Sequence, residues 1–243
     1  MNTVLILGAT SDIAQAIARQ FAGHQYALQL AARHPAQLEN LASDLRIRHQ
    51  VEVQTLEFDA THFESHAEFY QRLSPAPSVA ITVFGYLGDQ EKGQQDWKEA
   101  ETILQTNYTG AVSILNIIAE DFAAKKSGVI VGVSSVAGDR GRGSNYLYGS
   151  AKAGLSEYLS GLRNRMASVG VTVITVKPGF VDTSMTEGLD LPPLLTAQPS
   201  AVAQDVYQAV KHKKDVIYTR WFWRWIMLII KLIPEKIFKK LKL

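Results

Sequence analysis

The chain contains no cysteine among its 243 residues. A disulfide framework, a thiolate nucleophile and a cysteine-based metal site are therefore excluded. The six histidines show no His-Glu-x-x-His pattern, so no metal site is expected. His62 and His66 lie four residues apart, and we expect them to occupy an exposed helix face.

The sequence also shows neither a strong net charge nor the pattern expected of a secretory leader. The apolar run near the start is too short for a signal peptide and follows no basic region, which predicts a cytoplasmic location. Net charge is only +2, which does not suggest a nucleic-acid-binding protein. The charge is uneven, because residues 220–243 hold seven basic residues and one acid, which gives +6 and leaves −4 for the remainder.

Apolar residues make up 47% of the chain, enough for one large α/β domain. Short apolar runs predict strands at 4–7, 26–32, 51–58, 79–83, 129–133, 171–176 and 216–218. Helical patterns occupy 61–73, 96–125, 148–168 and 199–211. The alternation predicts a doubly wound parallel sheet, a Rossmann fold, in a single domain at 1–219 with a tail at 220–243.

The first apolar run ends in a glycine turn that opens a helical pattern. This is the context that a dinucleotide site requires, because the turn's N–H groups and the helix N-terminus hold a pyrophosphate. The residues expected to contact the cofactor here are Gly8, Thr10, Ser11, Asp12 and Ile13. A carboxylate is unusual beside a diphosphate, so we expect Asp12 to cap the helix with its charge turned away.

The end of the second predicted strand bears on the choice of cofactor. Sites selective for NAD place a carboxylate here to bind the ribose 2′-hydroxyl. No acid occurs between Asp12 and Glu39, and Arg33 stands where it can pair with a 2′-phosphate. We therefore expect NADP(H) rather than NAD(H); the alternative for Arg33 is a solvated loop charge.

A hydroxyl, a phenol and an amine form the most informative set. Tyr148 and Lys152 lie four apart in a predicted helix and therefore share one face. A nearby ammonium favours the phenolate and is expected to lower the tyrosine pKa. Ser135 follows an apolar strand thirteen residues before Tyr148, and its hydroxyl can meet that face. The set predicts acid–base chemistry on a carbonyl; the alternative is a half-buried aromatic beside a solvated lysine.

These residues resemble those of the short-chain dehydrogenase/reductase family over nearly the whole chain. The resemblance rests on residues 8–14, Asp59, Asn107, the Ser135, Tyr148 and Lys152 set, and Pro178-Gly179. It implies that Tyr148 is the general acid or base and that Ser135 polarises the carbonyl. It further implies that Lys152 binds the nicotinamide ribose and that Asn107 holds a water in a proton relay.

The same resemblance implies further cofactor contacts and self-association. The expected contacts are Asp59 against the adenine, together with Gly85, Pro178, Gly179, Val181 and Thr183. An Asn-Asn pair common in the family is missing before Gly85, so its hydrogen bonds must come from elsewhere. A homodimer or homotetramer is expected, and residues 184–198, rich in proline, are expected to form a mobile substrate lid.

The tail is aromatic and aliphatic but interrupted by charge. A bilayer span needs about 20 mostly apolar residues, and Arg224 and Lys231 break the run. On a helix these two and Arg220 fall on one side, which predicts an amphipathic helix lying in the headgroup region of a membrane. The alternative is an arm packed on a partner subunit or over the active site.

Residues 80–91, 134–138, 148–150 and 233–241 resemble one subgroup of the family, the reductases of decaprenylphosphoryl-2-keto-pentose. That subgroup also carries an acid near position 12. The resemblance implies reduction of a hydrophobic or lipid-linked ketone, such as a polyprenyl-phosphate keto-sugar, at the inner face of the membrane. A 3-oxoacyl or steroid-like ketone reductase is one alternative, and a catalytically inactive NADP-sensing protein is another.

Overall fold

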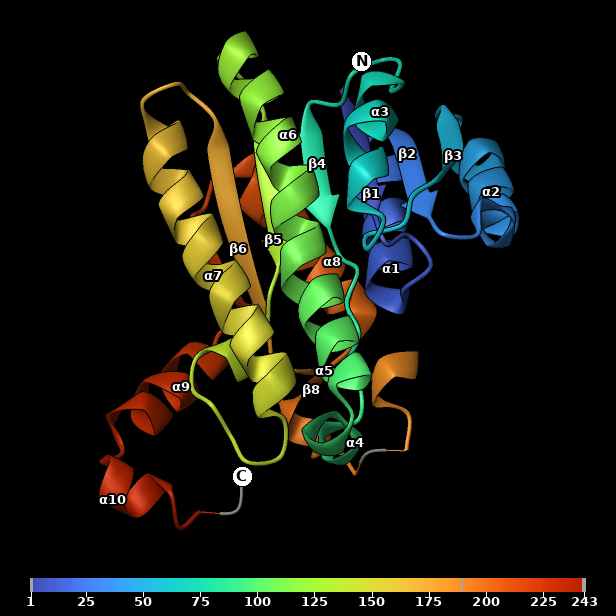
Figure 1. Ribbon diagram of the computed structural model, residues 1–243. Coiled ribbons are helices and arrows are strands. Elements are labelled where there is room, and N and C mark those ends of the chain that lie inside the picture. Colours follow the sequence, from blue (N-terminus) through green and yellow to red (C-terminus); the bar gives the residue numbers. More distant parts are fainter. Residues whose placement is uncertain (1, 189, 242–243) are drawn as a thin grey trace.

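A computed structural model describes residues 2–188 and 190–241 and shows a parallel sheet with helices on both faces (Figure 1). The strand order is β3-β2-β1-β4-β5-β6-β9, and all six pairings are parallel. The strands are β1 (Thr3–Leu7), β2 (Ala27–Ala32), β3 (Val53–Glu57), β4 (Val79–Thr82), β5 (Val129–Val133), β6 (Thr172–Pro178) and β9 (Val216–Thr219). The predicted doubly wound sheet is confirmed.

The five inner strands are apolar runs because they are covered on both faces, whereas the edge strands β3 and β9 are partly exposed. In β1, Val4 and Ile6 belong to one core layer while Leu5 and Leu7 belong to the other, and all four are fully buried. The first layer packs α1 (Asp12–Ala22), α2 (Glu39–His49) and α8 (Pro199–Lys211) on the sheet. The second packs α3 (His66–Gln71), α6 (Gly110–Lys125) and α7 (Tyr146–Ala167).

The predicted helix at 96–125 is divided into three parts. It consists of α5 (Trp97–Leu104), a π-helical turn (Gln105–Thr109) and α6. A further short helix, α4 (Gln90–Gln95), precedes it and was not predicted. The π-helical turn contains Asn107, which the family resemblance predicts to hold a water.

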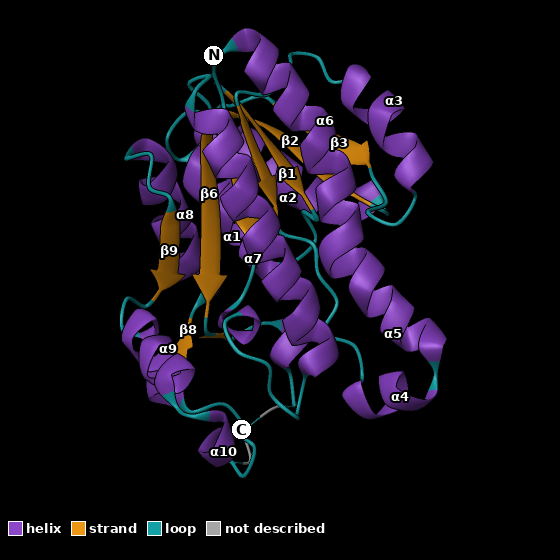
Figure 2. Ribbon diagram, turned by 60° about the vertical axis from the view of Figure 1, so that its left-hand side comes forward, coloured by secondary structure: helices purple, strands orange, loops and turns teal. Residues whose placement is uncertain are grey.

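Two short strands, β7 (Phe180–Val181) and β8 (Thr196–Ala197), pair at the two ends of the predicted lid. The tail forms α9 (Trp223–Leu232) and α10 (Glu235–Phe238). No helix in the described ranges is both long enough and apolar enough to cross a membrane. Figure 2 shows that α4, β8, α9 and α10 all lie beyond the carboxyl ends of the strands, at one edge of the sheet.

The sheet order reverses at β1, which lies between β2 and β4. Such a switch point leaves a crevice outside the carboxyl ends of the strands, where open α/β sheets bind ligands. The candidate site lies at this edge.

Candidate active site

A cleft of ≈ 810 Å³ opens at the switch point. Its lining includes nine residues that the sequence assigned to the cofactor: Gly8, Thr10, Ser11, Asp12, Ile13, Arg33, Asp59, Gly85 and Thr183. They come from the segments that follow four strands, β1 to β4, from the start of α1 and from the segment after β7. The structure thus brings these residues together around one cavity.

The glycine turn packs tightly against the chain that follows β4. Gly8 has φ of +88°, and a Cβ at this position would lie 2.6 Å from the backbone nitrogen of Phe84, so only glycine fits. The hydroxyl of Ser11 accepts a hydrogen bond from the Ala14 amide at 3.2 Å and caps α1. The remaining N–H groups of the first turn point out of a helix N-terminus, which suits a pyrophosphate.

Asp12 does not cap the helix, because Ser11 does, so that expectation is wrong. The Asp12 carboxylate instead accepts hydrogen bonds from the amide and the hydroxyl of Ser184, at 2.8 and 2.9 Å. Ser184 belongs to the predicted lid. Asp12 therefore ties the glycine turn to the segment that would cover it.

Asp59 closes the other end of the cleft. Its Oδ1 accepts hydrogen bonds from both the amide and the hydroxyl of Thr61, each at 2.8 Å. Burial opposes ionisation, but these hydrogen bonds outweigh it and lower the pKa of Asp59. Arg33 lies exposed at the rim, and its charge acts in the same direction.

The prediction of an exposed histidine face is wrong for His66, which is 0% exposed. Its Nε2 hydrogen bonds the carbonyl of Asp59 and its Nδ1 the hydroxyl of Ser113, each at 2.9 Å. Burial lowers the pKa of this ring, which favours its neutral form. His66 therefore fixes the backbone of Asp59, a role that helical spacing alone did not indicate.

Ser135 and Tyr148 meet where β5 and α7 converge. Ser135 lies two residues after β5, and its hydroxyl accepts a hydrogen bond from the Ala137 amide at 3.1 Å. A hydrogen bond joins the same hydroxyl to the phenol of Tyr148. Lys152 lies one turn further along α7, with Nζ 5.7 Å from the Tyr148 ring centroid and 3.1 Å from the Val133 carbonyl to which it donates.

The pKa of Tyr148 is raised, whereas the sequence predicted that a nearby ammonium would lower it. Desolvation raises the pKa of Tyr148 to about 12, although the hydrogen bond from Ser135 works in the other direction. Burial also lowers the pKa of Lys152 to about 8. At neutral pH the phenol therefore carries its proton and the amine remains charged.

Asn107 reaches the same point from the π-helical turn. Its Nδ2 donates to the carbonyls of Tyr86 and Ile103, at 2.6 and 2.8 Å, and its Oδ1 accepts from the Tyr86 amide at 3.2 Å. A Cβ at Gly85 would lie 2.9 Å from Asn107 Oδ1 and 3.4 Å from Lys152 Nζ. These two side chains thus converge on Gly85, and Asn107 holds the chain where the family's Asn-Asn pair is missing.

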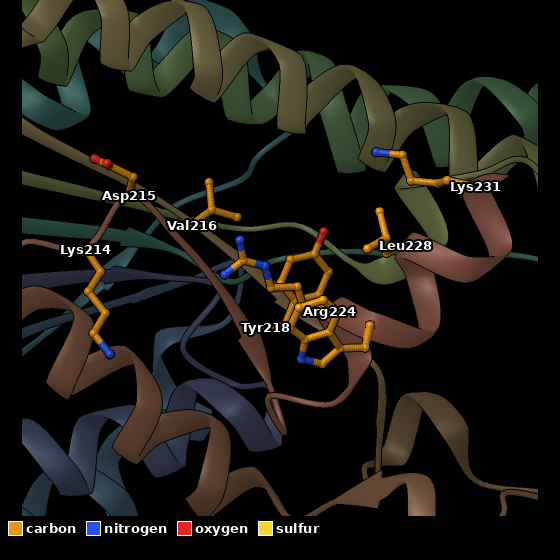
Figure 3. Close-up of a pocket in the computed structure, with 8 residues that line it drawn as sticks. Lys214, Asp215, Val216, Tyr218, Arg224, Leu228 and Lys231 are labelled. Carbon is orange, nitrogen blue, oxygen red and sulfur yellow. The ribbon is translucent and has the colours of Figure 1, made fainter.

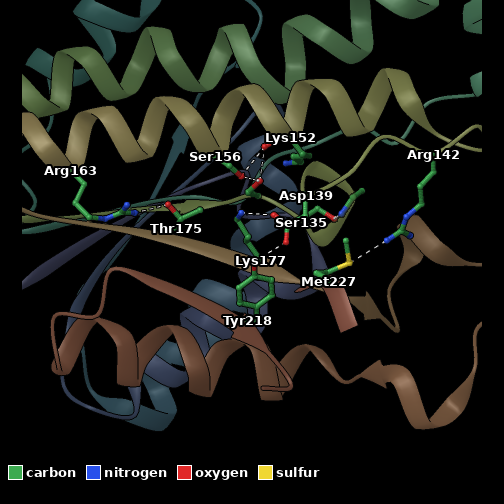
Figure 4. A network of polar contacts seen from close by, with 12 residues as sticks. Ser135, Asp139, Arg142, Lys152, Ser156, Arg163, Thr175, Lys177, Tyr218 and Met227 are labelled. Atoms are coloured by element: carbon green, nitrogen blue, oxygen red, sulfur yellow. Dashed lines mark hydrogen bonds and ion pairs between the residues drawn. The ribbon is translucent and has the colours of Figure 1, made fainter. Parts of the chain in front are cut away.

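Ser134, which the sequence did not single out, positions α7, the helix that carries Tyr148 and Lys152. Its hydroxyl donates to the Lys152 carbonyl and pairs with the Ser156 hydroxyl, both at 2.8 Å. Figure 4 shows Lys152 and Ser156 projecting from α7 toward the segment after β5 that contains Ser135. Adjacent residues at the end of a strand point to opposite sides. This alternation was the available signal that Ser134 and Ser135 have different partners.

Pro178, Gly179 and Val181 do not line the cleft. Pro178 ends β6, and Val181 is buried in β7. A Cβ at Gly179 would lie 2.0 Å from Nε1 of Trp223, so this glycine makes room for the tail. A role of these three residues in cofactor binding stays a prediction.

The chain resembles proteins of known family along almost its full length. Residues 2–192 match the short chain dehydrogenase family. A Mycobacterium tuberculosis protein named an uncharacterized oxidoreductase is 35% identical over 98% of this chain and 96% of its own. One from Streptomyces coelicolor is 33% identical over 99% and 96%. A short-chain dehydrogenase from Sphingobium yanoikuyae in complex with NADPH superposes with a TM-score of 0.83, at 23% identity over 97% of each chain. The chain therefore belongs to the short-chain dehydrogenase family of NAD(P)-dependent oxidoreductases.

Proposed function

We propose that this protein is an NADP(H)-dependent oxidoreductase that interconverts a ketone and a secondary alcohol. The observation that supports it best is the hydrogen-bonded Ser135 and Tyr148 pair with the buried Lys152 one turn away, next to the cleft. A nicotinamide bound in the cleft would supply or accept the hydride. Tyr148, neutral at pH 7, gives its proton to the carbonyl oxygen, and Ser135 holds that oxygen in place.

Lys152 and Asn107 support this step through charge and position. The ammonium of Lys152 lies close enough to favour the phenolate left after proton transfer. Asn107 places Gly85 beside that ammonium and is proposed to link it to a water relay. Gly85, Asp59, Thr183 and the residues of the glycine turn hold the cofactor.

The proposed preference for NADP(H) is supported by Arg33 at the cleft rim. The second strand, β2, ends next to Arg33 and carries no acidic residue, which also supports NADP(H). Two neighbours with the same fold, the Sphingobium yanoikuyae enzyme and ElxO, were determined with NADPH and NADP.

The proposed substrate is hydrophobic or lipid-linked, with a polyprenyl-phosphate keto-sugar as the specific candidate. Sequence segments that resemble the keto-pentose reductases support it, as do the exposed apolar side chains of the tail, residues 220–241. A 3-oxoacyl or steroid-like ketone is the alternative within the same reaction class. We further propose a homodimer or homotetramer that works on the inner face of the membrane, which sedimentation velocity and cell fractionation would test.

Replacement of Tyr148 tests the reaction. Tyr148→Phe removes the proton donor, so we expect ketone reduction to fall by at least about a hundredfold. NADPH affinity, measured by cofactor fluorescence, should remain nearly unchanged. Tyr158→Phe is the matched control, because it lies on the same helix and its hydroxyl bonds Asn116 instead. Full turnover by Tyr148→Phe would refute the assignment.

An NADP-sensing protein without turnover is the second candidate, favoured by Asp12 in the glycine turn and by the missing Asn-Asn pair. Single-turnover reduction of a small diketone by NADPH separates the two functions. Consumption of NADPH with formation of alcohol supports the enzyme, and tight binding without any consumption supports the sensor.

A further inference from the structure

The C-terminal arm (residues 220–241) has a buried inner face and an uncovered outer face. Trp223, Met227 and Phe238 are at most 9% exposed and hold the arm to the protein. The outer face carries seven exposed large apolar side chains: Trp221, Trp225, Leu228, Ile229, Leu232, Ile237 and Leu241. Ile229 is 66% and Leu232 73% exposed. A contiguous apolar face of this kind marks an interaction surface.

The charge around this face selects the partner. Arg220, Arg224, Lys231, Lys236, Lys239 and Lys240 are all exposed. Within the arm's described residues the one acid is Glu235, whose carboxylate is already paired with Arg140 at 2.9 Å. Tryptophans and basic residues around exposed aliphatic side chains suit the interface of an anionic lipid leaflet.

A groove of ≈ 630 Å³ between β9 and α9 adds a place for lipid headgroups. Figure 3 shows Arg224, Leu228 and Lys231 on α9 facing Val216 and Tyr218 on β9. Lys214 and Asp215 complete one end, and Trp225 also lines the groove. Asp215 lies 3.7 Å from Arg163, so its charge is partly compensated and the groove is cationic. A phosphate fits such cations, and the indole and leucine suit the adjoining glycerol region.

The arm is also tied to the loop that joins the catalytic residues. Arg140 lies in that loop, between Ser135 and Tyr148. Its Nη1 donates to the carbonyls of Ile230, Lys231 and Ile233 at 2.8, 3.1 and 2.7 Å. Its guanidinium stacks 3.8 Å from the Phe238 ring. The carbonyls at the end of α9 are thus satisfied by the catalytic loop.

The other end of the arm holds the predicted lid. Arg220 donates to the carbonyls of Leu194 and Thr196, at 3.2 and 2.9 Å, and Trp223 donates to the Leu195 carbonyl at 3.2 Å. The arm therefore bridges the two segments that flank the mouth of the site. It also lies at the edge of the sheet where the site opens, as Figure 1 shows.

We propose that the arm docks on an anionic phospholipid surface through its outer face, with headgroup phosphates in the β9–α9 groove, and so presents the mouth of the site to the membrane. Delivery of a lipid-borne ketone through this contact rests on the proposed function. The docking itself does not, because it requires no turnover.

Co-sedimentation with vesicles tests the docking. Wild type should bind phosphatidylcholine vesicles that contain phosphatidylglycerol, and bind those of phosphatidylcholine alone about tenfold less. The combined variant Trp225→Ser, Ile229→Ser and Leu232→Ser should lose binding by about tenfold or more. Arg224→Glu with Lys231→Glu should lose it as well. Ile47→Ser, at an 80% exposed apolar residue on α2, is the control and should bind like wild type.

Activity and self-association complete the test. Reduction of a water-soluble diketone should be unchanged in all these variants, so a loss of docking is distinguished from a failure of the catalytic assignment. Equal binding by wild type and the triple serine variant would overturn the proposal. The proposal would also be overturned if the triple serine variant dissociated to monomers in sedimentation velocity while its vesicle binding stayed at the wild-type level. A second copy of the chain would then be the partner that covers the outer face.

Discussion

At the scale of single residues, Lys152 combines its proposed catalytic role with a penalty in stability. It is 3% exposed, and burial lowers its pKa from 10.5 to about 8. Between these values the unfolded chain binds more protons than the folded chain, so the free energy of unfolding rises with pH across this window. Below pH 8 the folded protein carries the whole penalty of a buried charge.

Lys152→Met should therefore stabilise the protein at pH 7 by about 1–3 kcal/mol while abolishing ketone reduction. The gain should shrink as pH rises from 8 to 10.5, because the wild-type amine loses its charge there. Urea unfolding at pH 7 and pH 10 measures both values. Lys125→Met, at an exposed lysine paired with Asp121, should change stability by under about 1 kcal/mol. A destabilised Lys152→Met with no pH dependence would contradict the argument.

Replacement of Arg33, also a single residue, tests the choice between NADP(H) and NAD(H). A guanidinium that pairs with a phosphate contributes about 1.5–3 kcal/mol, so Arg33→Ala should weaken NADPH binding by about ten- to a hundredfold. NADH binding should hardly change, because NADH lacks the 2′-phosphate. Thermal shift with each cofactor, followed by calorimetry, measures the difference. Arg48→Ala, at an exposed arginine paired with Asp44 on α2, is the control. An equal loss for both cofactors would argue against this role.

At the scale of elements, the sequence predicted what depends on local pattern. The strands were readable because burial on both faces makes them continuous apolar runs, as in β1. The helix α4 was not predicted, although Asp89, which caps it by accepting from the Lys92 amide, was an available signal for its start. The π-helical turn was not predicted, because residues 96–125 have a helical composition throughout. The geometry of this turn arises from packing.

The same limit applies to the site. The spacing of Tyr148 and Lys152 fixed their shared face, and the glycine turn fixed the place of the cleft. The direction of the pKa shift at Tyr148 and the burial of His66 depend on the residues that pack over these side chains. Neither the periodicity nor the spacing of the sequence predicts that packing. The Asp12 bond to Ser184 joins residues far apart in the chain, so no local signal existed.

The contact between β6 and the arm gives a prediction at this scale. Gly179→Ala places a Cβ inside the Trp223 ring and should destabilise the protein by about 1–3 kcal/mol as α9 shifts. Gly161→Ala is the matched control, since it lies in α7 with open space around it and should stabilise by about 0.5–1 kcal/mol. Urea unfolding reports both changes. Equal effects would show that the arm packs loosely at this point.

At the scale of the whole molecule, three segments meet around one opening. The arm contacts the loop between Ser135 and Tyr148 through Arg140, and the predicted lid through Arg220. The lid in turn reaches the glycine turn through Ser184 and Asp12. A chain of direct contacts thus runs from the outer face of the arm to the cofactor cleft. Binding at one end that orders these segments makes binding at the other end less costly in entropy.

Lipid docking and NADPH binding should therefore strengthen each other. Anionic vesicles should raise NADPH affinity, and NADPH should raise vesicle affinity by the same factor, because coupling between two equilibria is reciprocal. We expect a factor of about five, near the lower end of measured couplings. Calorimetry with and without vesicles gives one side, and co-sedimentation with and without NADPH gives the other. Asp12→Ala cuts the link at Ser184 and should bring both factors to about one, whereas Asp44→Ala on α2 should leave them at the wild-type value. A factor of one in wild type would show that the arm and the cleft bind independently, even if each binds its own ligand as proposed.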